Sequence, residues 1–154
     1  YCFSTVTHHE FKKIYELFYD NGKKVIKNEL FNYITPRSLA FWIMDDGSAG
    51  FNQNKVYIRL HTEGFTEDDN YRLQTMLKSC FDIRSKVCRY NRNDKVYCYL
   101  SINKENTIKL SKLVEEYFVD CWKYKIAPQR LECQSSSDQS DDGDTVWPSP
   151  KVKK

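Results

Sequence analysis

The sequence lacks several patterns that would assign it to a common class of protein. No apolar run approaches the roughly 18 residues that a membrane-spanning helix needs, and no segment has a signal-peptide pattern. The six cysteines include no C-x-x-C pair, and together with the three histidines they match no common zinc spacing. Scattered cysteines of this kind favour a reducing compartment.

Neither sign of charge dominates, because the net charge is only +3 over 154 residues. A mild basic excess is compatible with nucleic-acid binding but does not require it. Hydrophobic residues make up 40% of the chain and aromatic residues 15%, which indicates a globular protein, and the length suits one compact domain or one and a fraction. Towards the C-terminus Ser, Asp, Gln, Gly and Pro dominate, so a disordered tail is predicted over 127–154.

Hydrophobic periodicity predicts an α+β domain. The predicted elements, in chain order, are a helix that begins at the Thr7–Glu10 capping box, a connector over 23–26, a helix capped by Thr35, a strand over 55–63, a helix capped by Thr66, a hairpin of 84–90 and 95–102, and a helix over about 105–119. The first helix places Phe11, Ile14, Tyr15 and Phe18 on one face. This order predicts an antiparallel sheet with helices on one face and solvent on the other.

Alternation assigns the two faces of the sheet. The core side is predicted to include Val56, Ile58, Leu60, Thr62, Val96, Cys98, Leu100 and Ile102, above a helical stripe of Leu73, Met76, Leu77 and Cys80. The open side is predicted to carry Lys55, Tyr57, Arg59, His61, Lys95, Tyr97 and Tyr99, with Arg84, Lys86, Arg89 and Arg92 around the hairpin. Such side chains can reach phosphates and base edges in the major groove. The alternative is a solvated face with incidental aromatic residues.

One apolar helical run ends abruptly in two carboxylates and a glycine, at Leu39-Ala40-Phe41-Trp42-Ile43-Met44-Asp45-Asp46-Gly47. Carboxylates at a helix C-terminus face the negative end of the helix dipole. We therefore expect a cation, either a metal ion or a lysine, to offset this cost. The alternative is a core helix with a polar C-terminal cap, since glycine just past a helix end is ordinary.

This run resembles the LAGLIDADG motif of homing endonucleases, in the variant with an aromatic third residue and an Asp before the catalytic Asp. The preceding Tyr33-Ile34-Thr35-Pro36-Arg37-Ser38 is similar to the entry that these enzymes use before their second motif, and the similarity extends from about residue 5 to residue 126. The resemblance implies an αββαββα half, in which an antiparallel β-sheet saddle with helices on one face straddles the major groove of double-stranded DNA.

The resemblance also implies roles for individual residues. Asp46 matches the acidic metal ligand of the family, and Asp45 occupies the preceding position, whose carbonyl also binds metal; Mg²⁺ is the implied cofactor. Lys24 and Lys125 lie in contexts that resemble those of active-site lysines, where they would stabilise developing charge. The alternative for each lysine is a solvated surface charge. Glu63 stands where related sequences often carry Gln near the catalytic water. Its carboxylate could bind the metal, act as a base, or repel the phosphate and so impair cleavage.

The family pairs two motif helices, and this sequence contains one motif. Residues 1–34 resemble the end of a first domain with its linker, and 35–126 the second domain. The chain is therefore expected to be a fragment that needs the missing first motif or a homodimer partner. The leading function is an intron-encoded, site-specific DNA endonuclease of a mitochondrion or plastid, with no membrane partner. The alternatives are an RNA maturase that binds intron RNA and a decayed, inactive endonuclease.

Overall fold

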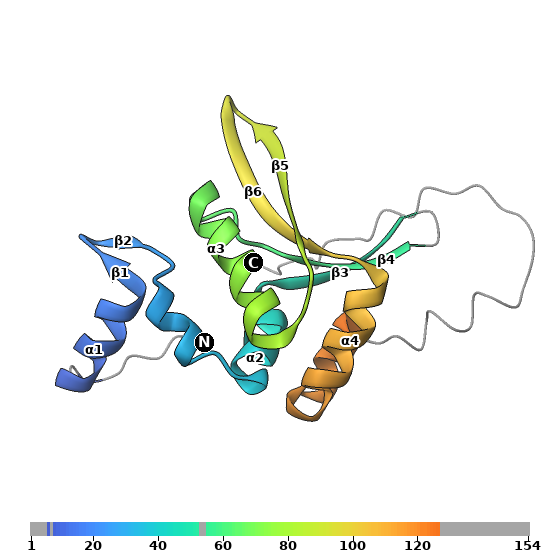
Figure 1. Ribbon diagram of the computed structural model, residues 1–154, viewed down its shortest axis with the longest axis horizontal. Helices are drawn as coiled ribbons and strands as arrows, with labels where there is room; N and C mark the ends of the chain where they lie inside the picture. Colours follow the sequence, from blue (N-terminus) through green and yellow to red (C-terminus); the bar gives the residue numbers. More distant parts are fainter. Residues whose placement is uncertain (1–5, 7, 53–54, 127–154) are drawn as a thin grey trace, which may run out of the picture.

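A four-stranded antiparallel sheet and the helices packed against it form the body of the structure, a computed structural model that describes residues 6, 8–52 and 55–126 (Figure 1). The elements are α1 (His9–Phe18), β1 (Tyr19–Asp20), β2 (Lys23–Lys24), η1 (Asn28–Asn32), α2 (Pro36–Asp46), β3 (Gly47–Asn52), β4 (Lys55–Leu60), α3 (Glu67–Phe81), β5 (Lys86–Arg92), β6 (Lys95–Ile102), α4 (Lys104–Val114), η2 (Glu115–Tyr117) and η3 (Asp120–Lys125). The predicted α+β class and its antiparallel sheet are confirmed.

The strand order of the sheet is β3-β4-β6-β5, with all neighbours antiparallel. The β5–β6 hairpin extends well beyond the rest of the sheet (Figure 1). Its turn residues Asn93 and Asp94 have φ of 49° and 58°. Two consecutive positive φ values are typical of the two-residue type I′ turn, whose twist matches that of the flanking strands.

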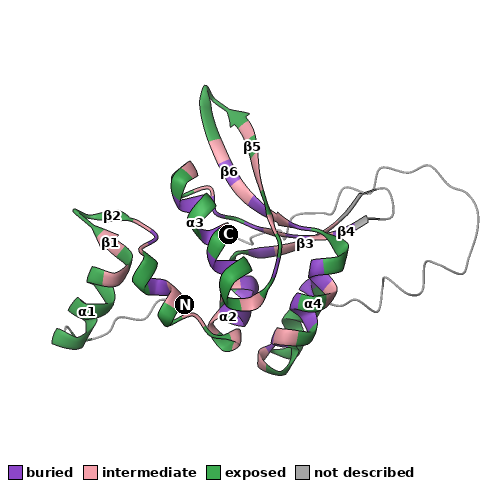
Figure 2. Cartoon of the chain, viewed as in Figure 1, coloured by how far each residue is buried: buried purple, intermediate pink, exposed green. Residues whose placement is uncertain are grey.

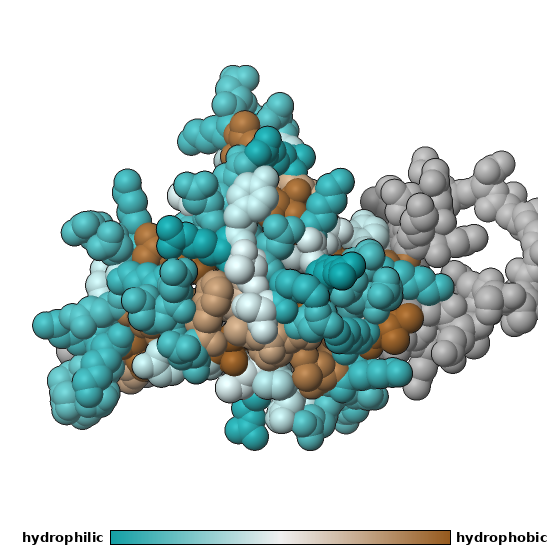
Figure 3. All heavy atoms as spheres, viewed as in Figure 1, coloured by the Kyte–Doolittle hydropathy of each residue, from teal (hydrophilic) through white to brown (hydrophobic). Residues whose placement is uncertain are grey.

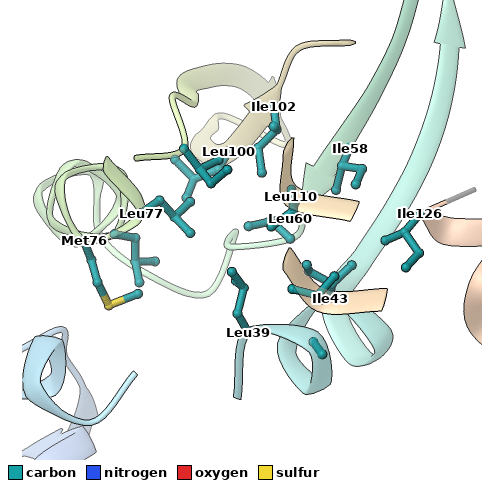
Figure 4. Packing of buried hydrophobic residues seen from close by; sticks show 14 of the residues in the cluster. Leu39, Ile43, Ile58, Leu60, Met76, Leu77, Leu100, Ile102, Leu110 and Ile126 are labelled. Carbon is teal, nitrogen blue, oxygen red and sulfur yellow. The ribbon is translucent and has the colours of Figure 1, made fainter. Parts of the chain in front are cut away.

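The core lies between the inner face of the sheet and helices α2, α3 and α4. Leu39 and Ile43 of α2 meet Ile58 and Leu60 of β4, and Leu77 of α3 lies in the same cluster (Figure 4). All five are 0–1% exposed. Figure 2 shows buried residues along the inner sides of α2, α3 and α4, whereas α1 is mainly exposed. Truncating one of these leucines to alanine would cost about 2–5 kcal/mol.

Local sequence fixes both ends of α2. At the N-terminus, the Ser38 amide donates to the Thr35 hydroxyl (3.2 Å) and the Thr35 amide donates to the Ser38 hydroxyl (2.7 Å), which closes a capping box before Pro36. At the C-terminus, a Cβ on Gly47 would lie 2.4 Å from the Ile43 carbonyl oxygen. Only glycine therefore lets α2 pass directly into β3.

Hydrophobic periodicity did not predict strand β3, although the resemblance implied a strand there. Its sequence contains two glycines and no clear alternation, and its pairing with β4 specifies it instead. A Cβ on Gly50 would lie 2.3 Å from the Tyr57 ring, so the ring lies directly over this glycine. The connector predicted over 23–26 was also wrong in part, because β1 and β2 form a small hairpin around Asn21 and Gly22.

Other differences are shifts of boundary or exposure. The strand predicted over 55–63 ends at Leu60, the strand predicted over 84–90 spans Lys86–Arg92, and the last helix gives way to a 3-10 turn at Glu115. Cys80 is exposed rather than part of the buried stripe, and Val96 is 63% exposed because it lies near the tip of the hairpin. Thr7 and the predicted tail over 127–154 lie outside the described residues.

The apolar stripe of α1 is also not buried. Phe11, Ile14, Tyr15 and Phe18 are 39–54% exposed, so the amphipathic pattern is present but no element of the described chain covers it. In the space-filling view, hydrophobic side chains gather in the lower middle, around the position of α2, between mainly hydrophilic surroundings (Figure 3). None of the described helices is both long and apolar enough to span a bilayer.

Candidate active site and nucleic-acid interface

The two carboxylates of the motif lie at the C-terminal end of α2, and both side chains are exposed. Ser38, Trp42 and Asp46 are spaced four residues apart and therefore share one face of this helix. That face lines a mainly apolar cavity of about 800 Å³, which α1, η1 and α3 also border. Lys24 lies on the same cavity, so the structure brings two predicted site residues, Lys24 and Asp46, to one hollow.

Lys125 is buried beneath the end of α2, with 7% exposure. Its ammonium donates to the Met44 carbonyl at 2.6 Å and lies 3.5 Å from the Ile43 carbonyl. Burial lowers the pKa of Lys125 below its ordinary value, and the negative charges of Asp45 and Asp46 partly oppose this. The expected cation at the negative end of α2 is therefore a lysine, and the solvated-charge alternative for Lys125 is wrong.

The remaining backbone of the helix end is tied to the sheet. The His61 amide donates to the Asp46 carbonyl at 2.9 Å, just past the end of β4. The Gly47 amide donates to the Ile43 carbonyl. These bonds satisfy carbonyls that a helix end would otherwise leave free, and they hold the Asp46 backbone at the rim of the sheet.

Lys24 is an exposed residue of β2, but the segment after it is held firmly by α3. The Ile26 amide donates to a carboxylate oxygen of buried Asp69 (3.0 Å), and Arg72 donates to the Ile26 carbonyl (3.1 Å). Thr66 donates in turn to the other oxygen of Asp69 (2.7 Å). This clamp was not predicted from sequence, because nothing local relates Ile26 to residues more than 40 positions away.

The open face of the sheet carries a group of aromatic and basic side chains, as predicted. The guanidinium of Arg59 lies 3.7 Å from the centre of the Tyr99 ring and 5.5 Å from that of Tyr90. Tyr90 was not predicted, although it pairs directly with Tyr97 and its ring stacks there at 5.6 Å. Strand alternation also places the exposed Lys86 and Lys95 on this face.

Two other predicted basic residues lie elsewhere, and the side chain of a third is not among the described ones. Arg89 lies on the opposite face, where its guanidinium pairs with Glu67 of α3, so its assignment to the open face was wrong. Arg84 is exposed but precedes β5, and its amide donates to Asn106 of α4 (2.8 Å). The side chain of Lys55 lies outside the described residues.

Glu63 joins two of the predicted DNA-binding residues. One of its carboxylate oxygens, Oε1, lies 2.8 Å from Arg59 Nη2 and 3.3 Å from His61 Nδ1. Burial raises the pKa of Glu63, but hydrogen bonds from its own backbone, Arg59 and His61 outweigh burial and lower the pKa overall. The other ring nitrogen of His61 lies 2.9 Å from the hydroxyl of Ser48 in β3. Ser48 was not predicted as a site residue, because strand β3, which carries it, was not predicted.

The exposed Asp46 carboxylate at the end of α2 is the type of donor that a hard cation prefers. Among the described residues, no group of three His, Cys, Asp or Glu side chains could hold a metal ion on its own. Mg²⁺ uses one or two carboxylates and keeps several waters, and an exposed Asp46 carboxylate suits such a site. Zinc, which takes three or four protein ligands, does not fit here.

Comparisons with known proteins agree with this geometry. A sequence profile of the LAGLIDADG DNA endonuclease family matches residues 1–110. The chain is 30% identical over 136 residues to Probable intron-encoded DNA endonuclease 3 of Mycosarcoma maydis, covering 85% of this chain and 95% of that protein. It is 32% identical over 124 residues to Cytochrome b mRNA maturase bI2 of Debaryomyces hansenii, covering 80% and 45%.

Among solved structures, the chain is similar to the homing endonuclease I-WcaI bound to its DNA recognition sequence. The TM-score is 0.69 and the identity 31%, covering 80% of this chain and 54% of that one. The chain thus spans nearly all of the first relative, but about half of the maturase and of the solved endonuclease. The family profile covers the motif helix, the sheet and most of α4. The chain therefore belongs to the LAGLIDADG DNA endonuclease family.

Proposed function

We propose that this protein is a site-specific DNA endonuclease of the homing type, which hydrolyses phosphodiester bonds with Mg²⁺. The observation that carries the proposal is an exposed Asp46 carboxylate at the end of α2, with buried Lys125 behind it and the basic, aromatic face of the sheet beside it. A bound Mg²⁺ would stabilise negative charge on the attacking and leaving oxygens of the scissile phosphate.

In this proposal each candidate site residue has one role. Asp46 supplies the carboxylate ligand, and the Asp45 carbonyl is the second candidate oxygen. Lys125 lies beneath the two carboxylates with its ammonium on the Met44 carbonyl, where it would hold the end of α2 in place and offset its negative dipole. Lys24, on the cavity that Asp46 lines, can contribute positive charge near the cleaved strand. The open sheet face binds the major groove through Tyr57, Arg59, His61, Lys86, Lys95, Tyr97 and Tyr99, with Lys55 and Arg84 at its margins.

A complete site requires a second acidic motif. We propose that residues 1–34 close a preceding LAGLIDADG domain and that a second motif helix enters the cavity beside Ser38, Trp42 and Asp46. The exposed apolar stripe of α1 supports this, because the described chain leaves it uncovered. A lone copy of the chain would then be inactive, or active only as a dimer through α2.

Binding of intron RNA is the second candidate, favoured by the relative named as a cytochrome b mRNA maturase. The same basic and aromatic side chains could contact RNA. Relatives that are named intron-encoded endonucleases or maturases also support placing the protein in an organelle, a mitochondrion or plastid. The cysteines of the described part are free thiols, in keeping with a reducing compartment.

Cleavage selection on DNA tests the proposal directly. The full chain is incubated with a plasmid library of randomised inserts in Mg²⁺, and the cleaved ends are sequenced, with EDTA as the control. We expect ends that share one sequence, only with Mg²⁺ and only at protein concentrations at which light scattering shows two copies paired through α2. Absence of any cleavage, combined with splicing of the host intron in the presence of the chain, would favour the maturase. Absence of both would mark a decayed enzyme.

A further inference from the structure

Arg59 differs from an ordinary DNA-binding arginine, because its guanidinium is already held on two sides. The Tyr99 ring lies 3.7 Å from it, and Glu63 accepts a hydrogen bond from Nη2 at 2.8 Å. Its side chain is 29% exposed and that of Glu63 is 20% exposed. Within the described residues, Arg59 Nε is buried without a hydrogen-bond partner. The side chain therefore presents the guanidinium in one fixed orientation.

The opposite charges of Arg59 and Glu63 argue against a contact between Arg59 and a phosphate. Glu63 neutralises Arg59, and its carboxylate would lie close to any phosphate that approached the same guanidinium. Arginine retains several donors when one is engaged, and these can still bond neutral acceptors. The commonest arginine contact of that kind is a bidentate one to O6 and N7 of guanine in the major groove.

The same carboxylate oxygen also orients His61. Glu63 Oε1 lies 3.3 Å from His61 Nδ1, and Ser48 Oγ lies 2.9 Å from His61 Nε2. Nδ1–H can donate to Glu63, while Nε2 lies within hydrogen-bond distance of the Ser48 hydroxyl, so both ring nitrogens have a partner. Glu63 Oε1 thus contacts two neighbouring side chains of the sheet surface, as expected of a residue that positions others.

We propose that Arg59 reads a guanine in the major groove and that Glu63 is the residue that positions it, rather than a base or ligand in the cleavage reaction. The inference rests on the proposed DNA-binding function and gives one position of its specificity. A held guanidinium loses little conformational entropy on binding, which favours discrimination between bases.

Two readouts distinguish base contact from phosphate contact. A pool of randomised DNA duplexes is selected in EDTA for binding to the full-length wild-type, Arg59→Ala and Glu63→Gln chains, each in a separate experiment. The affinity of each chain for the enriched duplex is then measured as a function of salt concentration. Lys86→Ala, an exposed lysine on the same face, is the matched control for a phosphate contact. Removing the Lys86 charge should make the negative slope of log K against log salt shallower by about 0.9 and leave base preferences unchanged.

Arg59→Ala should lose preference for guanine at one position and weaken binding of the enriched duplex about tenfold or more, with the salt slope unchanged. Glu63→Gln keeps an acceptor but removes the neutralising charge, so the slope should steepen by about 0.9 while the guanine preference declines. Circular dichroism checks that each variant folds.

Four results would overturn the inference. Base preferences of Arg59→Ala identical to those of wild type would exclude base reading, and a slope reduced as in Lys86→Ala would show a phosphate contact. A Glu63→Gln chain that binds like wild type but no longer cleaves would show a catalytic role. If wild type itself enriches no sequence, the proposed DNA specificity fails along with the inference.

Discussion

The Lys125 ammonium lies 2.6 Å from the Met44 carbonyl oxygen, at the end of the helix that carries Asp45 and Asp46. The two residues are 81 positions apart, and η3 places the lysine there, with Nζ 4.5 Å from the centre of the Trp122 ring. A buried cation at this point opposes both the negative end of the helix dipole and the paired carboxylates. The motif helix therefore depends on a residue from the far end of the domain.

Replacing Lys125 with methionine should destabilise the domain by about 1–3 kcal/mol, because the Met44 carbonyl loses its donor in a buried place. Part of the effect should depend on the carboxylates. In an Asp45→Asn background the same substitution should cost less, since fewer negative charges then lack a cation. Urea unfolding of the four chains of this double-mutant cycle measures the coupling, and strictly additive effects would contradict it.

Truncating Asp69 to alanine should free the segment that carries Lys24. The Ile26 amide would lose its buried acceptor, at a cost of about 1–3 kcal/mol. Hydrogen exchange should accelerate at Lys23–Ile26, while exchange in β4 stays slow. Asp68→Ala, one position away on the exposed side of α3, is the control and should leave exchange at Lys23–Ile26 unchanged. Equal protection of this segment in both variants would show that the clamp does not hold it.

The Asp82 carboxylate links α3 to α4, and its contribution should vanish in acid. Hydrogen bonds from Lys109 and Lys78 lower the pKa of Asp82 from 3.8 to about 2. A lowered folded pKa stabilises the folded state above about pH 4, and this contribution is lost as the pH falls towards 2. Asp82→Asn retains the left-handed conformation of this residue (φ 54°) that asparagine tolerates.

The difference in urea midpoint between wild type and Asp82→Asn should accordingly be constant from pH 7 to about pH 5, decline steadily below that, and be mostly lost at pH 2. A difference that is as large at pH 2 as at pH 7 would mean that the carboxylate acts through packing or geometry rather than through charge. The effect should be small, because both lysines and the carboxylate are exposed.

A charge on the cavity face of α2 should block pairing of motif helices. Trp42→Glu places a carboxylate where Trp42 now lines the cavity, and it should shift light scattering towards a monomer and abolish double-strand cleavage. Val96→Glu introduces the same charge at a 63% exposed position of the hairpin and should leave the assembly intact. Full double-strand cleavage by a strict monomer of the wild-type chain would contradict the need for a second motif.

Patterns within one segment were enough to predict much of this fold. Thr35 caps α2, and alternation correctly buries Ile58, Leu60 and Leu100. Strand β3 was missed because glycine-rich segments carry no alternation, and its identity comes from pairing with β4. Val96 was assigned to the core because alternation shows which side a residue faces, whereas its exposure depends on how far the hairpin extends beyond the helices.

The site was predictable in a different way. Position in the motif selected Asp46 as a candidate, and resemblance alone selected Lys125, whose burial follows from contacts between distant segments. Glu63 was singled out for a possible catalytic role, but only the folded chain shows that its carboxylate accepts bonds from Arg59 and His61. Side-chain partners of this kind depend on register between strands, which single-sequence patterns do not determine.

Single-turnover cleavage by Asp46→Asn, beside Asp45→Asn, tests the central claim that Asp46 is the acidic residue of the reaction. Both side chains are exposed at the same helix end, so the two substitutions remove equal charge at neighbouring places. At saturating DNA and Mg²⁺, Asp46→Asn should cleave about 100-fold more slowly or worse with unchanged DNA binding, and Asp45→Asn much less so. Cleavage by Asp46→Asn at the wild-type rate would contradict the account.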